Sequence, residues 1–554
     1  MAKETLNLTV GQVIENLAIS RPNEVAIDYG DREFRRTWRQ LDELTDKIAK
    51  GWLKLGIGKG DHVAIWATNV PEWLLTLFST AKIGAILVTV NTNYKIFESE
   101  FLLRQSDTKA LVLIAGFKDS NYTNIINELC PNLKFSSNGS PDSERLPMLK
   151  KVIFAGENTP QGMLSFDILE KLGEDIEDKE LQAIKDSLDA HDVINMQYTS
   201  GTTGFPKGVM LTHYNIVNNG LTIGQGMKLS GKDKLLICVP FFHCFGLVLA
   251  VMACITNQAA IVPVEYYQPK VVMKALHNKQ CTALHGVPTM FIGLLQMPDF
   301  SDYKLNLRTG IMAGSPCPIE VMRQVIDKMN MREITIVYGL TEASPGCTMT
   351  TTQDSIDQRV NTVGRAFPGV DTKIIDPESG KILGVDQPGE FCARGYNIMK
   401  GYYKMPEATA QAIDKEGWLH TGDLATVDKD GYYKIVGRIK DMIIRGGENI
   451  YPKEIEEFLY THPKIKDVQV VGVPSKKYGE EILACIILKE GEALSEEEVK
   501  EFVRGSIARH KIPSYVLFMD SFPTTASGKI QKYKLREQAV SVFKLFDADS
   551  IETA

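Results

Sequence analysis

Apolar and amphipathic segments alternate along the chain from residue 9 to about 435. Short apolar stretches at 62–66 and 85–90 are typical of buried strands, and the stretch 72–83 between them has the spacing of an amphipathic helix. Strands that alternate with helices pair in parallel, because each crossover helix covers a face of the sheet. The pattern therefore predicts an α/β fold with largely parallel sheets.

The pattern changes after about residue 360, where short strands are separated by turn residues. Asp430-Gly431 lies between the apolar stretches 424–427 and 432–436, which predicts a hairpin. We expect a small β-rich subdomain there. Beyond residue 441 the pattern predicts a compact α+β unit, in which Ser495 and Glu498 form a capping box at a helix start.

Composition sets limits on the class of protein. A chain of 554 residues is too long for one core. It is 44% hydrophobic and 24% charged, with a net charge of −7, which argues against a general affinity for nucleic acid. The nine cysteines include no C-x-x-C pair, so neither a zinc site nor a disulfide framework is indicated.

Nothing in the apolar pattern predicts a membrane span. The longest apolar runs, such as 245–255, are shorter than the roughly 20 residues that cross a bilayer. The first residues lack the basic and then apolar character of a signal peptide. We expect a cytoplasmic protein with at most peripheral membrane contact.

Residues 198–208, Tyr-Thr-Ser-Gly-Thr-Thr-Gly-Phe-Pro-Lys-Gly, carry the strongest chemical signal. Glycines let backbone N–H groups approach a polyphosphate, the hydroxyls donate hydrogen bonds, and Lys207 supplies positive charge. An apolar run at 193–198 precedes the loop and a helical pattern follows from about His213, which predicts strand, phosphate loop and helix.

Two commoner nucleotide motifs do not fit. In a Walker loop Lys207 would follow Gly and precede Ser or Thr, whereas here Pro206 and Gly208 flank it. A dinucleotide fingerprint would require a third glycine after Gly224 and Gly226, where the chain has Leu229.

Four further signatures follow this loop in order: Tyr-Gly-Leu-Thr-Glu at 338–342, Trp-Leu-His-Thr-Gly-Asp at 418–423, Gly-Arg-Ile-Lys-Asp at 437–441, and Pro-Thr-Thr-Ala-Ser-Gly-Lys at 523–529. Together the five motifs resemble those of the acyl-adenylate-forming (AMP-binding) superfamily. That superfamily includes acyl-CoA synthetases, 4-coumarate-CoA ligases, luciferases and peptide-synthetase adenylation domains. The resemblance runs from near residue 10 to about 537 and is greatest to medium-chain and fatty acyl-CoA synthetases.

The resemblance implies a domain organisation. Residues 1–437 would form a large N-terminal adenylation domain, with two α/β subdomains and the small β-rich subdomain. Residues 438–441, which include Lys440, would be the hinge. Residues 442–554 would form a smaller, mobile α+β domain that rotates after adenylation.

The resemblance also implies an ATP-dependent acyl-CoA synthetase that uses Mg²⁺ and coenzyme A as well as its acid substrate. Thr341 would bind the α-phosphate and Glu342 would hold Mg²⁺, because a hard cation favours carboxylate oxygen. Asp423 would accept hydrogen bonds from the ribose, with Arg438 beside it. The remaining nucleotide contacts would come from the phosphate loop, an adenine-packing segment and a stacking tyrosine: Thr199, Ser200, Gly201, Thr202, Thr203, Gly204, Lys207, Gly314, Ser315, Pro316 and Tyr338.

Two further roles come from the C-terminal part of the chain. Lys529 would be the catalytic lysine that bridges the substrate carboxylate and the α-phosphate, a task that suits a point charge on a flexible stem. After rotation, Gly446 and Gly447 would line a tunnel for the pantetheine thiol. Each has a structural alternative, because a lone lysine in a polar loop is usually solvated and paired glycines also form tight turns.

The segment 240–246, Pro-Phe-Phe-His-Cys-Phe-Gly, resembles the lining of the acyl pocket, with His243 at its mouth. It holds no aspartate to pair with an ammonium group, which excludes amino acids as the acid. Phe245, Gly339 and Gly346 would complete an apolar pocket. We expect a medium- to long-chain fatty acid, with an aryl acid as the alternative.

Three rival activities share these motifs. A fatty-acyl-AMP ligase would deliver the acyl group to a carrier protein, and a luciferase-like oxygenase would share every motif. A catalytically dead binding module is disfavoured because Lys529 and Glu342 are both present. Partners are expected to be small molecules, without nucleic acid, and the protein a monomer or homodimer.

Overall fold

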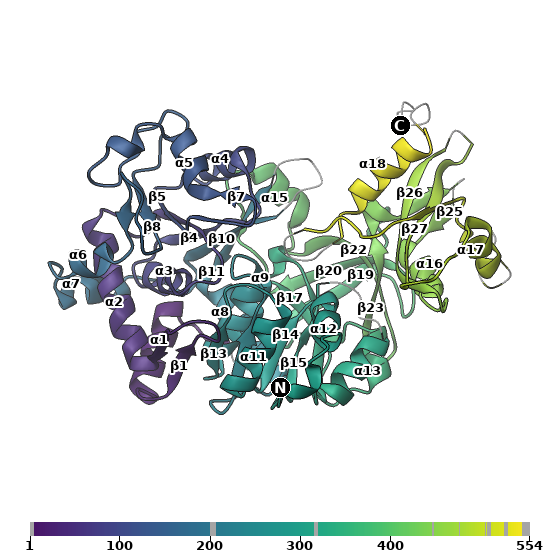
Figure 1. The fold of residues 1–554 in the computed structure, drawn as a ribbon, viewed down its shortest axis with the longest axis horizontal. Coiled ribbons are helices and arrows are strands. Elements are labelled where there is room, and N and C mark those ends of the chain that lie inside the picture. The colour runs from purple at the N-terminus through teal and green to yellow at the C-terminus, as the bar shows by residue number, and fades with distance from the viewer. Residues whose placement is uncertain are drawn as a thin grey trace. The chain divides into compact units, whose positions relative to one another are not determined.

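A computed structural model describes most of the chain (Figure 1): residues 5–199, 206–314, 319–445, 448–475, 477–504, 506, 511–525 and 530–545. The chain divides into two compact units. The first comprises the described residues up to Thr372 together with Ala393–Leu419. The second comprises Lys373–Cys392 and the described residues from His420 onward.

The first unit contains two large sheets. Among the described residues, one sheet has nine strands in the order β18-β17-β16-β15-β14-β12-β13-β1-β2. Its inner strands from β16 to β1 are parallel, and β2, β17 and β18 pair antiparallel at its edges. The strands are β1 (Val25–Asp28), β2 (Arg35–Thr37), β12 (Lys234–Ile237), β13 (Ala260–Pro263), β14 (Ala283–Gly286), β15 (Thr309–Met312), β16 (Glu333–Gly339), β17 (Gly346–Met349) and β18 (Arg365–Ala366).

The second sheet of this unit has eight described strands in the order β21-β11-β10-β4-β3-β5-β8-β9. It is parallel from β10 to β9, while β11 and β21 are antiparallel. The strands are β3 (His62–Trp66), β4 (Ile86–Thr89), β5 (Ala110–Leu113), β8 (Lys151–Phe154), β9 (Leu164–Ser165), β10 (Val193–Thr199), β11 (Lys207–Thr212) and β21 (Gly401–Tyr402). A short separate pair is formed by β6 (Gly116–Phe117) and β7 (Ser120–Asn121).

Helices cover these sheets, and several begin at clear capping residues. Thr9, Thr37 and Thr212 each accept a hydrogen bond from the third residue of the following helix, which satisfies a backbone N–H that would otherwise lack a partner. The helices are α1 (Val10–Ser20), α2 (Trp38–Lys54), α3 (Pro71–Lys82), α4 (Ile96–Gln105), α5 (Tyr122–Leu129), α6 (Ile168–Gly173), α7 (Asp178–Asp186), α8 (His213–Gly226), α9 (Cys244–Gly246), α10 (Ala253–Thr256), α11 (Pro269–Lys279), α12 (Pro288–Leu295), α13 (Ile319–Lys328), α14 (Ile356–Asn361) and α15 (Pro406–Ala412).

The α/β prediction is confirmed in detail at the N-terminal end. The expected strand at 62–66 is β3, and the expected helix at 72–83 and strand at 85–90 are α3 and β4 to within two residues. β3 and β4 pair in parallel with α3 as their crossover, and every residue of β3 is buried. A strand that is covered on both faces needs a continuous apolar run, which is the pattern that identified it.

The sequence analysis missed one strand next to the phosphate loop. The helix predicted from about His213 is confirmed as α8, but no strand was predicted before it, and Lys207–Thr212 form strand β11, which pairs antiparallel with β10. The run Gly-Val-Met-Leu-Thr is short and apolar, as in a strand, and α8 begins only after it. The loop therefore joins two strands of one sheet.

A small sheet lies at the junction of the two units in the sequence. Its described strands run in the order β19 (Val370–Ile375), β20 (Gly389–Gly395), β22 (Leu419–Val427) and β23 (Tyr433–Arg438). β22 and β23 form the predicted hairpin, and Gly431 in the turn has a φ of 81°, which glycine adopts without strain. The expected β-rich subdomain is thus present, and most of it belongs to the second unit.

The second unit also contains a mixed sheet built on the antiparallel pair β26 (Ile465–Ser475) and β27 (Gly479–Leu488), with β28 (Tyr515–Phe518) parallel to β27. Alternate side chains of these strands enter two different apolar clusters: Val468 and Val470 belong to one, and Val471 and Val473 to the other. The other elements are β24 (Ile443–Arg445), β25 (Glu448–Ile450), α16 (Pro452–Leu459), α17 (Glu496–Val503) and α18 (Lys532–Val542).

The first cluster contains residues of α16 and α17, and the second contains residues of α18, so this sheet is covered on both faces. Ser495 caps α17 through the predicted capping box with Glu498. Across the described residues, no helix combines the length and the apolar character that a membrane crossing requires. The predicted hinge at 438–441 includes a short helical turn, Ile439–Asp441, and its role as a pivot stays a prediction.

Candidate active site

Lys207, at the described end of the predicted phosphate loop, lies close to Tyr402 and Glu342 in the first unit. The Tyr402 hydroxyl donates a hydrogen bond of 2.9 Å to Oε1 of Glu342, and the Lys207 ammonium lies 5.0 Å from the centre of the Tyr402 ring. Burial raises the pKa of the Tyr402 hydroxyl, and the neighbouring carboxylate adds to the effect. The tyrosine therefore stays protonated and donates to Glu342.

Backbone pairing fixes this group. Lys207 begins β11 opposite Thr199, the last residue of β10, so the two predicted phosphate contacts face each other across neighbouring strands. β21 extends the same sheet, with Tyr402 opposite Val209. The Met399 N–H donates to the Glu342 carbonyl at 2.9 Å, which ties the segment before β21 to the turn that carries the glutamate.

Thr341 and Glu342 lie on a short helical turn that leaves β16 and returns into β17. The approach of the two strands is so close that a Cβ atom on Gly339 would lie 1.7 Å from the Pro345 carbonyl oxygen. Gly346 is similarly confined, because a Cβ there would lie 2.5 Å from the Phe367 ring. Both glycines are therefore needed for packing of the turn, whatever part they have in binding the acid.

The other predicted contacts of the first unit lie at strand ends. Tyr338 is on β16 next to Gly339, and Gly314 follows β15 with a φ of 90°, a value that favours glycine. Both strands are parallel members of the nine-stranded sheet, and ligands of open α/β sheets bind at the carboxyl ends of such strands.

The segment predicted to line the acyl pocket forms a tight turn into α9. Nδ1 of His243 accepts a hydrogen bond from the Phe245 N–H at 3.1 Å and so caps that short helix. Phe245 is buried, with its ring centre 5.8 Å from that of His285. A π-helix at Leu247–Met252 follows, and all of its residues are buried and apolar. Such helices occur often at functional sites.

His285 anchors the π-helix from the sheet side. Its Nε2 lies 2.8 Å from the Leu249 carbonyl oxygen, and its Nδ1 accepts from the Ile311 N–H at 3.1 Å. Nδ1 is an acceptor only in the neutral ring, so the proton is on Nε2. Burial lowers the pKa of His285 to about 4, in agreement with this assignment.

In the second unit, Asp423 and Arg438 face each other across the β22–β23 hairpin. Arg438 Nε donates to Asp423 Oδ1 at 3.1 Å, so the two predicted ribose-site residues are neighbours. The buried Glu390 on β20 holds the turn before Asp423. Its Oε1 accepts from the Gly422 N–H at 3.0 Å, and its Oε2 lies 2.9 Å from Nδ1 of His420.

Several predicted residues lie outside the described part of the chain: Ser200, Gly201, Thr202, Thr203, Gly204, Ser315, Pro316, Gly446, Gly447 and Lys529. The residues that flank 526–529 are described. Thr524 and Ile530 form an antiparallel bridge, and the Gln531 N–H donates to the Pro523 carbonyl at 2.8 Å. Lys532 then forms an ion pair with Glu456 at 2.6 Å, which anchors the start of α18.

Tyr402, Glu390 and His420 were not singled out by the sequence analysis. A signal for Glu390 was present, since it is a carboxylate directly before the apolar run Phe-Cys-Ala of its strand and a buried carboxylate requires partners. Tyr402 has no comparable local signal. Its contacts with Glu342 and Lys207 arise from sheet pairing between residues nearly 200 positions apart.

Comparison with known proteins agrees with this geometry. Residues 14–403 match the model of the AMP-binding enzyme family, and residues 454–529 match that of the AMP-binding enzyme C-terminal domain. The chain belongs to the AMP-binding enzyme family. It is an AMP-forming acid–thiol ligase of the acyl-CoA synthetase type, which uses ATP and CoA.

The similarity to individual relatives extends over nearly the whole chain. A putative acyl-CoA synthetase, YngI, of Bacillus subtilis is 54% identical over 98% of this chain and 99% of its own length. The human mitochondrial medium-chain acyl-CoA ligase ACSF2 is 42% identical over 96% of this chain and 87% of its own. The ATP-bound structure of MatB from Rhodopseudomonas palustris superposes with a TM-score of 0.83 at 27% identity, covering 97% of this chain and 100% of MatB.

The buried histidine makes stability depend on pH. As pH falls from 7 to 5, the unfolded chain protonates a histidine of pKa near 6.5, whereas folded His285, with a pKa of about 4, does not. The free energy of unfolding should therefore fall by about 2 kcal/mol from this group alone. Melting curves against pH test this. The free energy of unfolding of His285→Gln should fall less between pH 7 and 5 than that of the wild type. Equal falls in the two proteins would contradict a neutral, buried His285.

Proposed function

We propose that the protein activates a medium- to long-chain fatty acid through an acyl-adenylate and then transfers the acyl group to CoA. In the first step a carboxylate oxygen attacks the α-phosphorus of ATP, and the bond to the β-phosphate oxygen breaks to release pyrophosphate. In the second, the CoA sulfur attacks the acyl carbon, AMP leaves with the oxygen, and the thiol proton passes to solvent.

The group formed by Lys207, Tyr402 and Glu342 carries this proposal. The first step brings an anion to a polyanion, so positive charge must be placed where negative charge develops. Lys207 is part of the phosphate loop and would contact the β- and γ-phosphates, with the partner strand residue Thr199 as a hydroxyl donor. Thr341 would bind the α-phosphate beside them.

Glu342 is suited to hold Mg²⁺. One carboxylate oxygen accepts from Tyr402, which fixes the orientation of the group, and the carboxylate has a second oxygen to offer a cation. Bound Mg²⁺ would neutralise phosphate charge. Tyr338 and Gly314, with Ser315 and Pro316, would bind the adenine, and Asp423 the ribose.

Lys529 would supply the charge that joins the two reactants. In this proposal the C-terminal domain rotates about Lys440 between the half-reactions, withdraws Lys529 and presents Gly446 and Gly447 to the thiol. The ion pair between Lys532 and Glu456 and the bridge between Thr524 and Ile530 hold the residues on both sides of the segment that carries Lys529. This supports a defined position for that segment within the unit.

The buried, apolar π-helix behind Phe245 supports an alkyl substrate, and ACSF2 relatives are named for medium-chain acids. An aryl acid needs the same residue types and stays the alternative. A fatty-acyl-AMP ligase that delivers to a carrier protein is the second alternative.

Tyr402→Phe removes the hydroxyl that orients Glu342 but keeps the ring beside Lys207. We expect the apparent affinity for Mg²⁺ to fall by about 10- to 100-fold, because partners of metal ligands have effects of that size. Mg²⁺ titrations of activity and of ATP binding measure this. Tyr403→Phe is the matched control, since that neighbouring hydroxyl donates to Asp107 instead. An unchanged Mg²⁺ dependence in Tyr402→Phe would contradict the role of Glu342.

Lys529→Ala should lower the adenylation rate by about 10²- to 10³-fold, equivalent to roughly 3–4 kcal/mol of transition-state stabilisation. It should spare thioester formation from supplied acyl-AMP. Pyrophosphate release and acyl-CoA formation report the two half-reactions separately, and Lys534→Ala, an exposed lysine nearby, is the control. Gly447→Leu should show the reverse pattern. Equal loss of both half-reactions in Lys529→Ala would rule out a role for Lys529 in adenylation alone.

A series of straight-chain acids from short to long, together with cinnamate, tests the substrate class. AMP release with ATP and CoA should give the highest kcat/KM for medium or long chains. A maximum with cinnamate would favour the aryl alternative. Adenylation without acyl-CoA formation would favour delivery to a carrier protein.

A further inference from the structure

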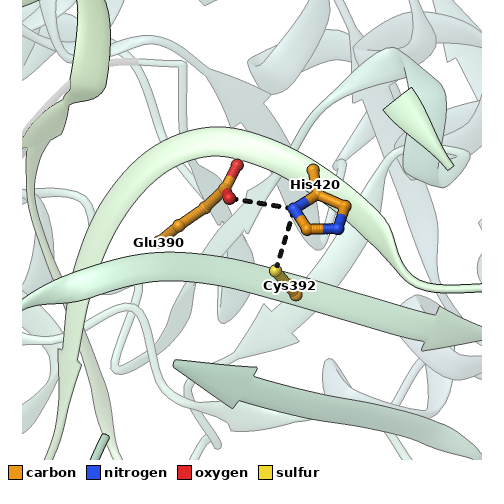
Figure 2. Close-up of side chains that lie close together, drawn as sticks. All are labelled: Glu390, Cys392 and His420. Carbon is orange, nitrogen blue, oxygen red and sulfur yellow. Dashed lines mark hydrogen bonds and ion pairs between the residues drawn. The ribbon is translucent and has the colours of Figure 1, made fainter. Parts of the chain in front are cut away.

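Three potential metal ligands of different kinds come together in the small sheet of the second unit (Figure 2). Glu390 and Cys392 lie two residues apart on β20, so both side chains project from the same face of the strand. His420 lies on β22, the neighbouring strand. Nδ1 of His420 is 2.9 Å from Glu390 Oε2 and 3.7 Å from Cys392 Sγ, and the three ligand atoms all lie within 4.8 Å of one another.

We propose that Glu390, Cys392 and His420 form a binding site for Zn²⁺. Carboxylate, thiolate and imidazole are the ligands that zinc takes, at about 2.0–2.3 Å and in tetrahedral geometry. Ligand atoms of a tetrahedral site then lie roughly 3.3–3.6 Å apart. The observed separations of 2.9 and 3.7 Å bracket that range, so small side-chain adjustments would admit the ion.

Charge and access also favour a dication. The thiolate and the carboxylate together would neutralise Zn²⁺, which matters because Glu390 and Cys392 are both buried. The His420 side chain is 29% exposed, so an ion could enter from its side and keep a water as fourth ligand.

A second cluster of potential metal ligands lies in the first unit. The carboxylates of Glu15, Asp42 and Asp46 also lie close together, but Lys82 and Lys185 form ion pairs with them at 2.5–2.8 Å. Cationic side chains therefore already neutralise that cluster. The cluster on β20 and β22 has ligands of three chemical kinds and a thiol, which selects for a softer metal.

Zinc binding would change the conformation of the turn before Asp423. Binding releases the Cys392 thiol proton to solvent and shifts the His420 ring proton to Nε2, so the hydrogen bond between His420 and Glu390 is lost. Because Glu390 also accepts from the Gly422 N–H, its movement would disturb the turn that leads to Asp423. Inhibition of the ligase by Zn²⁺ should follow, a consequence that rests on the proposed ribose contact of Asp423.

Metal titration of the purified full chain tests the site without an activity assay. Calorimetry should give one Zn²⁺ per chain at this site, and Co²⁺ should give a thiolate-to-metal absorption band. Cys392→Ala should abolish the band and weaken Zn²⁺ binding at least about tenfold. Cys485→Ala, which removes another buried thiol of the same unit, should leave both unchanged. A band that survives Cys392→Ala, or no zinc binding by the wild type, overturns the proposal.

Activity measurements then test whether zinc binding at this site also inhibits the ligase. Zn²⁺ should inhibit AMP release by the wild type and by Cys485→Ala, a chelator should restore it, and Cys392→Ala should be insensitive. If zinc binds with the expected stoichiometry but does not inhibit, the site stands and the coupling is overturned. Circular dichroism of each variant checks that it is folded, and His420→Gln, which should also lose the band, provides a second variant.

Discussion

One hydrogen bond, from Tyr402 to Glu342, holds opposite charges at a defined spacing in the first unit. The same tyrosine places its ring against Lys207, so a cation and a carboxylate lie on two sides of one aromatic side chain. An ion pair formed directly would neutralise both groups and leave neither for a ligand. The intervening ring keeps each charge available while the sheet fixes its position.

The turn that carries Glu342 is constrained from several directions. Gly339 allows β16 to approach the end of the turn at Pro345, Gly346 leaves room for the Phe367 ring, and Asn219 of α8 bonds both the N–H and the carbonyl of Gly346. Preorganisation of this kind matters for an enzyme whose catalysis depends on placed charge, because groups that do not need to reorganise stabilise the transition state most.

Sequence patterns predicted the features that depend on local chemistry. The buried strand β3, the helix α3, the hairpin turn at Gly431 and the Ser495 cap all have short-range signals, and the motifs were sufficient to predict the family. β11 was missed because its short apolar run lies between the loop motif and the helix start at His213 and has no turn signal of its own. The positions of Tyr402 and Glu390 depend on pairing between distant strands, which no local pattern encodes. The cysteine spacing likewise gave no sign of the cluster at Cys392, since its ligands come from two strands.

The sheet formed by β26 and β27 has a consequence for how the second unit can behave. Val468 and Val470 pack on one side and Val471 and Val473 on the other, so the strands bury their apolar surface within the unit itself. A unit whose apolar clusters are both enclosed in this way can move without exposing its own core to water. The rotation proposed above would then leave both apolar clusters of this sheet intact.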